Sequence, residues 1–179
     1  MNIHPHNRIM VIGNNGSGKS YLSKQLAAIT GLPVVHLDAE YWLPDLTKRP
    51  DDDWRPMHFA LITQERWIID GNYQQAGGLE PRWAAADLVI FLDVNRMICL
   101  ISAIKRNFHS REDGPRDFQE SWDRRFLKMC GLIWNFARDR RENLLAPREK
   151  NPDTLFFVIK GRKNMHKLLR EWKKDRGIQ

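Results

Sequence analysis

The chain has 179 residues, of which 42% are hydrophobic, and it carries a formal net charge of +7 with a sequence pI near 9.6. This length and hydrophobic share predict one globular domain, spanning residues 1–179, with a substantial core. Because no apolar stretch is long enough to cross a membrane, and the polar residues 1–7 are unlike a secretory leader, we expect a soluble cytoplasmic protein.

The charge and the cysteines restrict the function classes further. A basic chain suits nucleic acid, and it suits equally a site that neutralises the phosphates of small molecules, so charge alone leaves both open. Cys99 and Cys130 each lie within an apolar helical pattern. This placement predicts buried thiols in a reducing compartment and argues against a disulfide framework.

The first apolar run, residues 9–12, leads into a segment with the spacing Gly-x-x-x-x-Gly-Lys-Ser. Glycines at these positions let the loop turn so that successive backbone N–H groups converge on an anion, which predicts a phosphate-binding loop for ATP. We expect Lys19 to reach the β- and γ-phosphates and the Ser20 hydroxyl to ligate Mg²⁺. The residues expected to hold the nucleotide here are Gly13, Asn14, Asn15, Gly16, Ser17, Gly18, Lys19, Ser20 and Tyr21.

Helical and strand patterns alternate along the rest of the chain. Leucine and isoleucine spacing after Ser20 predicts a helix that ends at Gly31. Five short apolar runs predict buried strands at residues 8–12, 34–37, 67–69, 88–92 and 155–159. Strands that alternate with amphipathic helices indicate an α/β fold, with a parallel sheet covered on both faces.

Polar residues follow each predicted strand, where ligands bind in parallel α/β sheets. Asp38 follows the second strand and Asp70 the third, and Asp70 matches in position the acidic element that holds Mg²⁺ in phosphate-loop enzymes. Asp93 follows the fourth strand, and a structural role as a helix cap explains it as well as a functional role does. The fifth strand ends at Lys160, Gly161 and Arg162.

Two segments in the second half of the chain have no strand pattern. Residues 107–116 are polar and charged, and they predict a mobile excursion from the sheet. Residues 117–146 are rich in aromatic side chains and predict a helix or a helix pair whose aromatic stripe packs in the core. Before both, Met97, Ile101 and Ile104 lie at helical spacing and predict the apolar face of a further helix.

Several motifs together resemble a known family. The phosphate loop is followed by His36-Leu37-Asp38 with Tyr41-Trp42, by Trp67-Ile68-Ile69-Asp70-Gly71-Asn72-Tyr73, by Phe91-Leu92-Asp93 and by Ile133-Trp134-Asn135-Phe136. In this order they resemble bacterial DNA topology modulation (FlaR-related) proteins, which are similar to the adenylate kinase group of phosphate-loop kinases. The resemblance covers most of the chain.

The resemblance implies a three-layer phosphate-loop NTPase fold with a five-stranded parallel sheet in the order 2-3-1-4-5. It also implies a helical substrate-binding insertion at residues 38–64 and a lid at about 107–120. The lid arginines Arg106, Arg111 and Arg116 would clamp the transferring phosphoryl group. The base of ATP would lie near Gly161 and Arg162 and the start of the lid at Arg106.

The acceptor side follows the same template with departures. Asp38 matches in position the aspartate with which small-metabolite kinases orient and deprotonate a hydroxyl. Where nucleotide kinases continue Phe-Pro-Arg after Asp-Gly, this chain has Asn72-Tyr73-Gln74, so Arg82 would only loosely parallel the arginine that meets an acceptor's phosphate. The aromatic rings of the insertion either line the acceptor pocket or simply cover the sheet edge. The residues expected on the acceptor side are Asp38, Tyr41, Trp42, Asp70, Gly71, Asn72, Tyr73 and Arg82.

Three functions remain compatible with these patterns. The leading hypothesis is a kinase that uses ATP and Mg²⁺ to phosphorylate a small acceptor, which is a nucleoside, a nucleotide or another hydroxylated metabolite. An ATP-dependent nucleic-acid-binding protein that affects DNA topology is the alternative, although no helix-turn-helix, zinc-binding or RNA-binding motif supports it. The third is a nucleotide-binding protein without transfer activity. The sequence does not indicate an oligomeric state.

Overall fold

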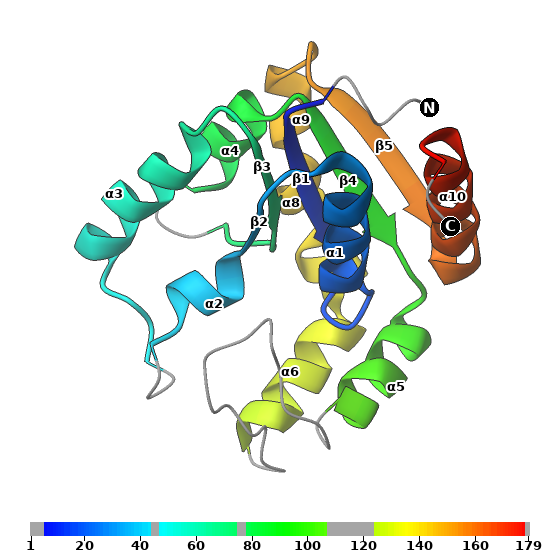
Figure 1. Ribbon diagram of the computed structural model, residues 1–179. Coiled ribbons are helices and arrows are strands. Elements are labelled where there is room, and N and C mark those ends of the chain that lie inside the picture. The colour runs from blue at the N-terminus through cyan, green and yellow to red at the C-terminus, as the bar shows by residue number, and fades with distance from the viewer. Residues whose placement is uncertain (1–5, 44–46, 75–77, 107–123, 178–179) are drawn as a thin grey trace.

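A computed structural model describes residues 6–43, 47–74, 78–106 and 124–177. The sheet has five parallel strands in the order β2-β3-β1-β4-β5, which confirms the predicted fold class and strand order (Figure 1). The strands are β1 (Arg8–Gly13), β2 (Val34–His36), β3 (Trp67–Asp70), β4 (Leu88–Asp93) and β5 (Leu155–Lys160). The helices are α1 (Lys19–Thr30), α2 (Leu37–Tyr41), α3 (Asp51–Ile62), α4 (Leu79–Ala85), α5 (Arg96–Arg106), α6 (Arg124–Trp134), α7 (Phe136–Asp139), α8 (Arg141–Leu145), α9 (Pro147–Lys150) and α10 (Gly161–Asp175).

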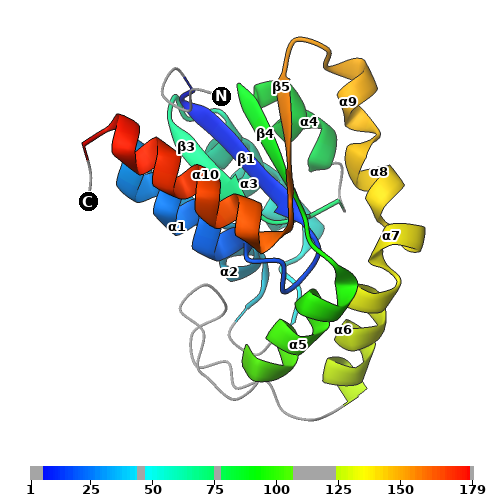
Figure 2. The same ribbon diagram turned by 90° about the vertical axis from the view of Figure 1, so that its right-hand side faces the viewer.

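Helices cover both faces of the sheet, as the uninterrupted apolar runs of its central strands require. Figure 2 shows α1 and α10 together on one face, with α4 and α8 on the other. Alternate residues of β1 therefore enter two separate cores: Ile9 and Val11 pack with α1 and α10, whereas Met10 and Ile12 pack with the helices opposite. The side chains of residues 9–12 are completely buried.

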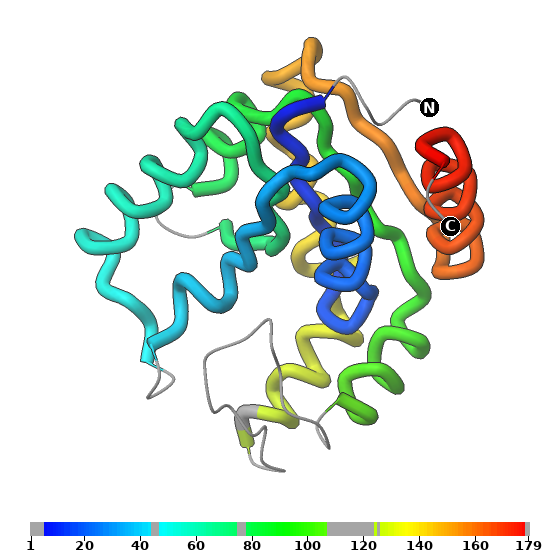
Figure 3. The backbone as a smooth tube through the Cα atoms, viewed as in Figure 1, coloured from blue at the N-terminus to red at the C-terminus, as the bar shows by residue number. Residues whose placement is uncertain are grey.

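Because the strands are parallel, the segments that follow them all begin at the same end of the sheet. Figure 3 shows the chain leaving β1, β2 and β4 at this end, where it continues into the phosphate loop, α2 and α5. The loop turns back into α1, which starts after Gly18 in a left-handed conformation and stops at Gly31, also left-handed. The helix predicted after the loop is thus confirmed, with Gly31 as its C-cap.

The face that α5 buries agrees with the prediction only in part, since Ile104 is half-buried. Met97 and Ile101 are each 48% exposed, while Cys99 and Ala103 are completely buried. The backbone of α5 lies close to the phosphate loop at this point, since a Cβ on Gly16 would lie 2.3 Å from the Cys99 carbonyl oxygen. Cys99 is therefore a buried thiol as expected, whereas Cys130 is only half-buried.

The segment predicted as a helix or a helix pair at residues 117–146 is more broken. Its described part contains three helices, α6, α7 and α8, interrupted at Asn135 and Arg140. Phe126, Ile133 and Phe136 are buried, so the aromatic stripe packs in the core. In the described ranges no helix is both long and apolar enough to span a membrane.

Candidate active site

Three glycines shape the loop between β1 and α1. Gly13, Gly16 and Gly18 have φ angles of 149°, 75° and 106°. The contact of Gly16 with α5 and its left-handed backbone both exclude a side chain at that position. Within the loop, the Ser17 N–H donates to the Asn14 carbonyl at 3.2 Å, and the Ser17 hydroxyl is buried without a hydrogen-bond partner among the described residues.

Lys19, the first residue of α1, is the point on which the predicted catalytic groups converge. Its Nζ donates to the carbonyl oxygens of Gly13 and Asn14, each at 3.2 Å. Burial lowers the pKa of Lys19 below its usual range; the carboxylates of Asp38 and Asp70 oppose this effect, and the guanidinium of Arg106 adds to it. Side chains from α2, β3 and α5 thus act electrostatically on one ammonium group.

The acidic residues occupy the ends of two neighbouring strands. Asp70 is only 5% exposed, and its Oδ2 lies 2.9 Å from Nδ1 of His36. Because His36 and Asp70 are register partners in β2 and β3, the sheet itself brings them together. Sequence reasoning placed His36 in a motif but missed this contact; the signal was its position as the last residue of a strand. Asp38 is the second residue of α2.

The segment after β3 is bound directly to the phosphate loop. The Asn72 side chain accepts a hydrogen bond from the Gly13 N–H at 3.0 Å and donates to the Gly13 carbonyl at 2.5 Å. The Gly71 N–H donates to the Val11 carbonyl at 3.1 Å. Residues that were expected only to contact the acceptor therefore also hold the loop that was expected to bind ATP.

Arg162 supports the same loop from the opposite side. Its Nη2 donates to the Gly16 carbonyl at 2.6 Å and to the Ser102 hydroxyl at 2.7 Å, and its Nε donates to the Ser17 carbonyl at 3.3 Å. Gly161, which opens α10, has a φ angle of 77°. The resemblance implied that Gly161 and Arg162 lie beside the base of ATP, which stays a prediction; the Arg162 side chain itself is directed at the phosphate loop.

The aromatic residues expected to line the acceptor pocket divide into buried and accessible rings. Tyr41 is 5% exposed and lies within 5.5 Å, ring centre to ring centre, of Tyr73, Trp54 and Trp42. The Tyr41 ring is thus covered by protein, which favours the alternative that it has a structural role over one in the acceptor pocket. Trp42 is only half-buried. His58 stacks on Trp54 in the same cluster.

Arg82 is completely buried behind the segment that follows Asp70. Its Nη2 donates to the carbonyl oxygens of Gly71 and Tyr73 at 3.3 and 3.1 Å, whereas Nε and Nη1 have no hydrogen-bond partner in the part of the chain that the structure describes. Burial lowers the pKa of Arg82 to about 9, and Asp70 opposes this shift. A buried guanidinium with unused donors attracts an anion.

Of the remaining predicted site residues, Tyr21, Arg106 and the expected metal ligands lie among the described residues, and two of the lid arginines do not. Tyr21 is 46% exposed and lies edge-on against His166 of α10. Arg106 is the last residue of α5, whereas Arg111 and Arg116 of the expected lid lie outside the described residues. No group of three or more histidine, cysteine or acidic side chains capable of holding a metal occurs among the described residues. Mg²⁺ needs no such cage, since it binds through one or two protein oxygens, phosphates and water, and Ser20 with Asp70 fits that requirement.

Comparisons with known proteins add evidence on the fold. Neither a family model nor a curated protein matches the sequence. Solved structures do match: the shikimate kinase from Acinetobacter baumannii in complex with shikimate is 14% identical, covers 94% of each chain and has a TM-score of 0.55. The shikimate kinase from Bacteroides thetaiotaomicron (14% identity, 97% of this chain and 99% of that chain, TM-score 0.50) and a sugar kinase from Janibacter sp. HTCC2649 (16%, 95% and 94%, 0.50) are similar. The chain therefore shares the fold of these solved structures. At 14% and 16% identity the likeness gives no information about its substrate.

Proposed function

We propose that the protein is a kinase that transfers the γ-phosphoryl group of ATP to a small acceptor. The observation that carries the proposal is the half-buried Lys19 at the start of α1, whose ammonium group donates to the Gly13 and Asn14 carbonyls of the loop and lies within electrostatic reach of Asp38, Asp70 and Arg106. Phosphoryl transfer depends mainly on positioning and on neutralising charge, and this cluster offers both positive and negative groups beside an anion-binding loop. The kinase fold of the matching structures is consistent with this assignment.

On the nucleotide side, the loop N–H groups and Lys19 would bind the β- and γ-phosphates of ATP. Ser20 and Asp70 would hold Mg²⁺, which neutralises charge on the phosphates when it is bound. His36 would orient the Asp70 carboxylate through the contact of 2.9 Å. Lid arginines, with Arg106 at their start, would close over the transferring group and exclude water.

On the acceptor side, Asp38 would orient the attacking hydroxyl and accept its proton. Trp42, half-buried in the insertion, would form a wall of the acceptor site. Arg82 favours an acceptor that carries a negative group. Its buried positive charge lies directly behind the segment from Gly71 to Tyr73, which is expected to contact the acceptor. The acceptor class favoured is therefore a hydroxylated metabolite with a carboxylate or a phosphate.

The first test measures ADP release from ATP and Mg²⁺ with a panel of neutral sugars, sugar acids, phosphorylated sugars, nucleosides and nucleotides. We expect one acceptor class with an anionic group to stimulate turnover, and Lys19→Ala to abolish it. Lys24→Ala, an exposed lysine on the same helix, is the matched control and should retain full activity. Equal turnover in the Lys19→Ala protein would refute the proposal; a flat panel combined with DNA binding in a gel-shift would favour the nucleic-acid alternative.

The acceptor charge is tested separately with Arg82. Arg82→Met removes the buried charge while keeping an unbranched chain, and we expect it to raise the KM for the acceptor by about tenfold or more. The KM for ATP should rise by a smaller factor, because Arg82 binds Gly71 and Tyr73 directly and acts on the phosphate loop only through the contacts of Gly71 and Asn72 with it. Arg82→Lys should recover part of the loss. An unchanged acceptor KM in the methionine variant would remove the anionic acceptor from the proposal while leaving the kinase assignment intact.

A further inference from the structure

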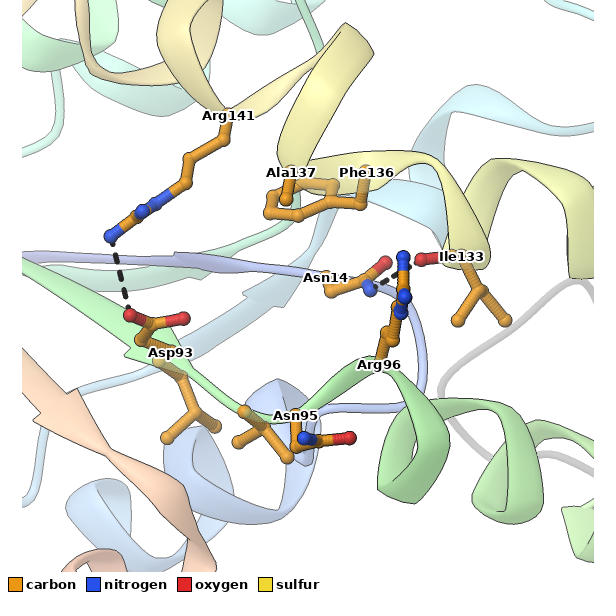
Figure 4. Close-up of a pocket in the computed structure, with 10 residues that line it drawn as sticks. Asn14, Asp93, Asn95, Arg96, Ile133, Phe136, Ala137 and Arg141 are labelled. Carbon is orange, nitrogen blue, oxygen red and sulfur yellow. Dashed lines mark hydrogen bonds and ion pairs between the residues drawn. The ribbon is translucent and has the colours of Figure 1, made fainter.

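A pocket of about 290 Å³ lies beside the phosphate loop, at the carboxyl end of β4. Its walls come from β4 and the segment after it, from the start of α5, from the junction of α6 and α7, and from α8 (Figure 4). The phosphate loop contributes only Asn14 to the lining. Lys19, Ser20, Asp38 and Asp70 are not among its lining residues, so the pocket adjoins the candidate active site through Asn14 and lies outside the rest of it.

The charged groups of the pocket favour an anionic ligand. Arg96 and Arg141 extend into it from different elements, and Asp93 is the only carboxylate among its lining residues (Figure 4). The guanidinium of Arg96 lies 4.1 Å from the ring centre of Trp134, a contact that leaves its N–H donors available for hydrogen bonds. The lining therefore holds two positive charges and one negative charge.

The pairing of Arg141 with Asp93 is weak enough to be replaced. Nη2 of Arg141 lies 3.2 Å from Oδ2 of Asp93, in a single contact, and the side chains are 45% and 37% exposed. An ion pair exposed to this degree contributes little stability, at most about 1 kcal/mol. A carboxylate or phosphate that binds Arg141 would thus compete with Asp93, and Arg96 adds a second positive charge to the same pocket.

The rest of the lining is apolar and limits the size of the ligand. Leu92, Val94, Ile133, Phe136 and Ala137 supply this surface. A volume of about 290 Å³ lies at the lower end of the usual range for ligand pockets, which favours a small metabolite over a nucleotide. The pocket thus fits a compact apolar body that carries an anionic group.

Asn14 links the pocket to the site proposed for ATP. Its Nδ2 donates to the Ile133 carbonyl at 2.9 Å, a buried hydrogen bond across the edge of the pocket (Figure 4). The backbone carbonyl of Asn14 accepts hydrogen bonds from Nζ of Lys19 and from the Ser17 N–H. A ligand that shifts Asn14 or the junction of α6 and α7 will therefore alter the carbonyl that holds Lys19.

We infer that this pocket binds a small metabolite with a carboxylate or phosphate group, and that the bound metabolite changes the affinity of the phosphate loop for ATP. The second part rests on ATP binding to the phosphate loop, as proposed above, and does not require phosphoryl transfer. Coupling of this kind is reciprocal: ATP must change the affinity for the metabolite by the same factor.

Calorimetric titration of the full chain without ATP tests the binding site. The probes are benzoate and phenyl phosphate, with benzyl alcohol as the neutral counterpart. We expect both anions to bind and the alcohol not to bind. Arg96→Gln and Arg141→Gln should each weaken binding by about tenfold or more. Asp93→Asn should strengthen it, because Arg141 then loses its competing carboxylate.

Two controls separate this pocket from other sites. Arg148→Gln removes another arginine that lies over an aromatic ring, Phe156, outside the pocket, and it should leave binding unchanged. Lys19→Ala should also bind both anions, with a smaller change in affinity than the arginine variants cause, since Lys19 reaches the pocket only through the Asn14 carbonyl; retained binding excludes the phosphate loop as their site. Thermal melting of each variant shows whether it is folded. If an arginine variant unfolds, Asp93→Asn still tests the site, because it is expected to bind the anionic probes more tightly.

The inference is overturned by any of three results: no anionic probe binds the wild-type protein, the arginine variants bind as tightly as wild type, or Lys19→Ala loses binding. For the coupling, we expect saturating probe to change the ATP dissociation constant and ATP to change the probe's constant by an equal factor. Simple competition between ATP and the probe would show that the pocket belongs to the nucleotide site. Failure of the acceptor panel with these results intact would refute the kinase activity alone.

Discussion

The side chain of Asn72 pairs with both backbone groups of Gly13, in the way that a neighbouring strand would. The Gly13 carbonyl also accepts a hydrogen bond from Nζ of Lys19, so the two side chains share one acceptor. This arrangement joins the segment after β3 to the first residue of the phosphate loop. The position of the proposed acceptor segment and that of the ATP loop are consequently linked.

Replacing Asn72 should impair both ATP binding and stability. Asn72→Ala removes two hydrogen bonds, which predicts a loss of about 1–2 kcal/mol in the free energy of unfolding. Asn72→Asp should raise the KM for ATP more than the alanine variant does, because it loses the donor and adds a negative charge beside the loop. Urea unfolding and ATP titration measure the two effects. Asn164→Ala, which removes an exposed bond to the Lys160 carbonyl, is the control expected to leave ATP binding unchanged.

Alanine substitutions at Gly16 and Gly31 distinguish the effect of a steric clash from that of backbone strain. Both have left-handed backbones, with φ angles of 75° and 71°, but a Cβ on Gly16 would lie 2.3 Å from the Cys99 carbonyl, whereas one on Gly31 meets nothing within 4 Å. Gly31→Ala should cost only the conformational penalty of about 1–2 kcal/mol. Gly16→Ala should cost several kcal/mol more and abolish ATP binding, because the loop must move away from α5. Equal melting temperatures for the two variants would contradict the close approach.

Arg162 should act on ATP binding through the shape of the loop. Arg162→Ala removes three hydrogen bonds, to Gly16, Ser17 and Ser102, and we expect the KM for ATP to rise by about tenfold with a smaller change in kcat. Arg162→Lys should recover only part of the affinity, because one ammonium group does not reproduce the planar geometry of a guanidinium. Arg170→Ala, an exposed arginine on the same helix, should match wild type. A kcat loss without a KM change would argue against this positioning role.

His58 should make the fold sensitive to acid. Burial, assisted by the charge of Arg82, lowers the pKa of His58 from 6.5 to about 4. Between these values the unfolded chain binds a proton that the folded chain does not, so stability falls as the pH drops from 6.5 toward 4 and is fully restored above 6.5. One pKa unit corresponds to about 1.4 kcal/mol, so the loss is at most about 3 kcal/mol.

His58→Phe keeps a planar ring beside Trp54 and removes the titrating group. The difference in unfolding free energy between the variant and wild type should therefore grow in favour of the variant as the pH is lowered from 6.5 to 4. Urea unfolding at several pH values measures this difference. A constant difference across that range would show that His58 does not account for the acid sensitivity.

Much of the fold was predictable because its signals are local. An apolar run bounded by polar residues marks each strand, and each predicted strand lies within one residue of its observed ends. The phosphate loop is equally local, since glycines that adopt left-handed conformations and Lys19 all lie in one short segment. The helix faces were harder to predict: the pattern of α5 predicted Met97 as buried, but Met97 is exposed and Cys99 is buried, with its carbonyl close to Gly16 of the loop.

The contacts within the candidate site depend on distances that local patterns do not encode. Asp70 meets His36, 34 residues away, because β2 and β3 are neighbours in the sheet. Arg162 reaches Gly16 across 146 residues, because α10 packs beside α1. By itself the sequence determined where the strands lie, and it predicted which of the residues that follow them carry chemistry. Only the tertiary structure decided which of these side chains meet, because strand order, helix rotation and burial arise from packing the whole chain at once.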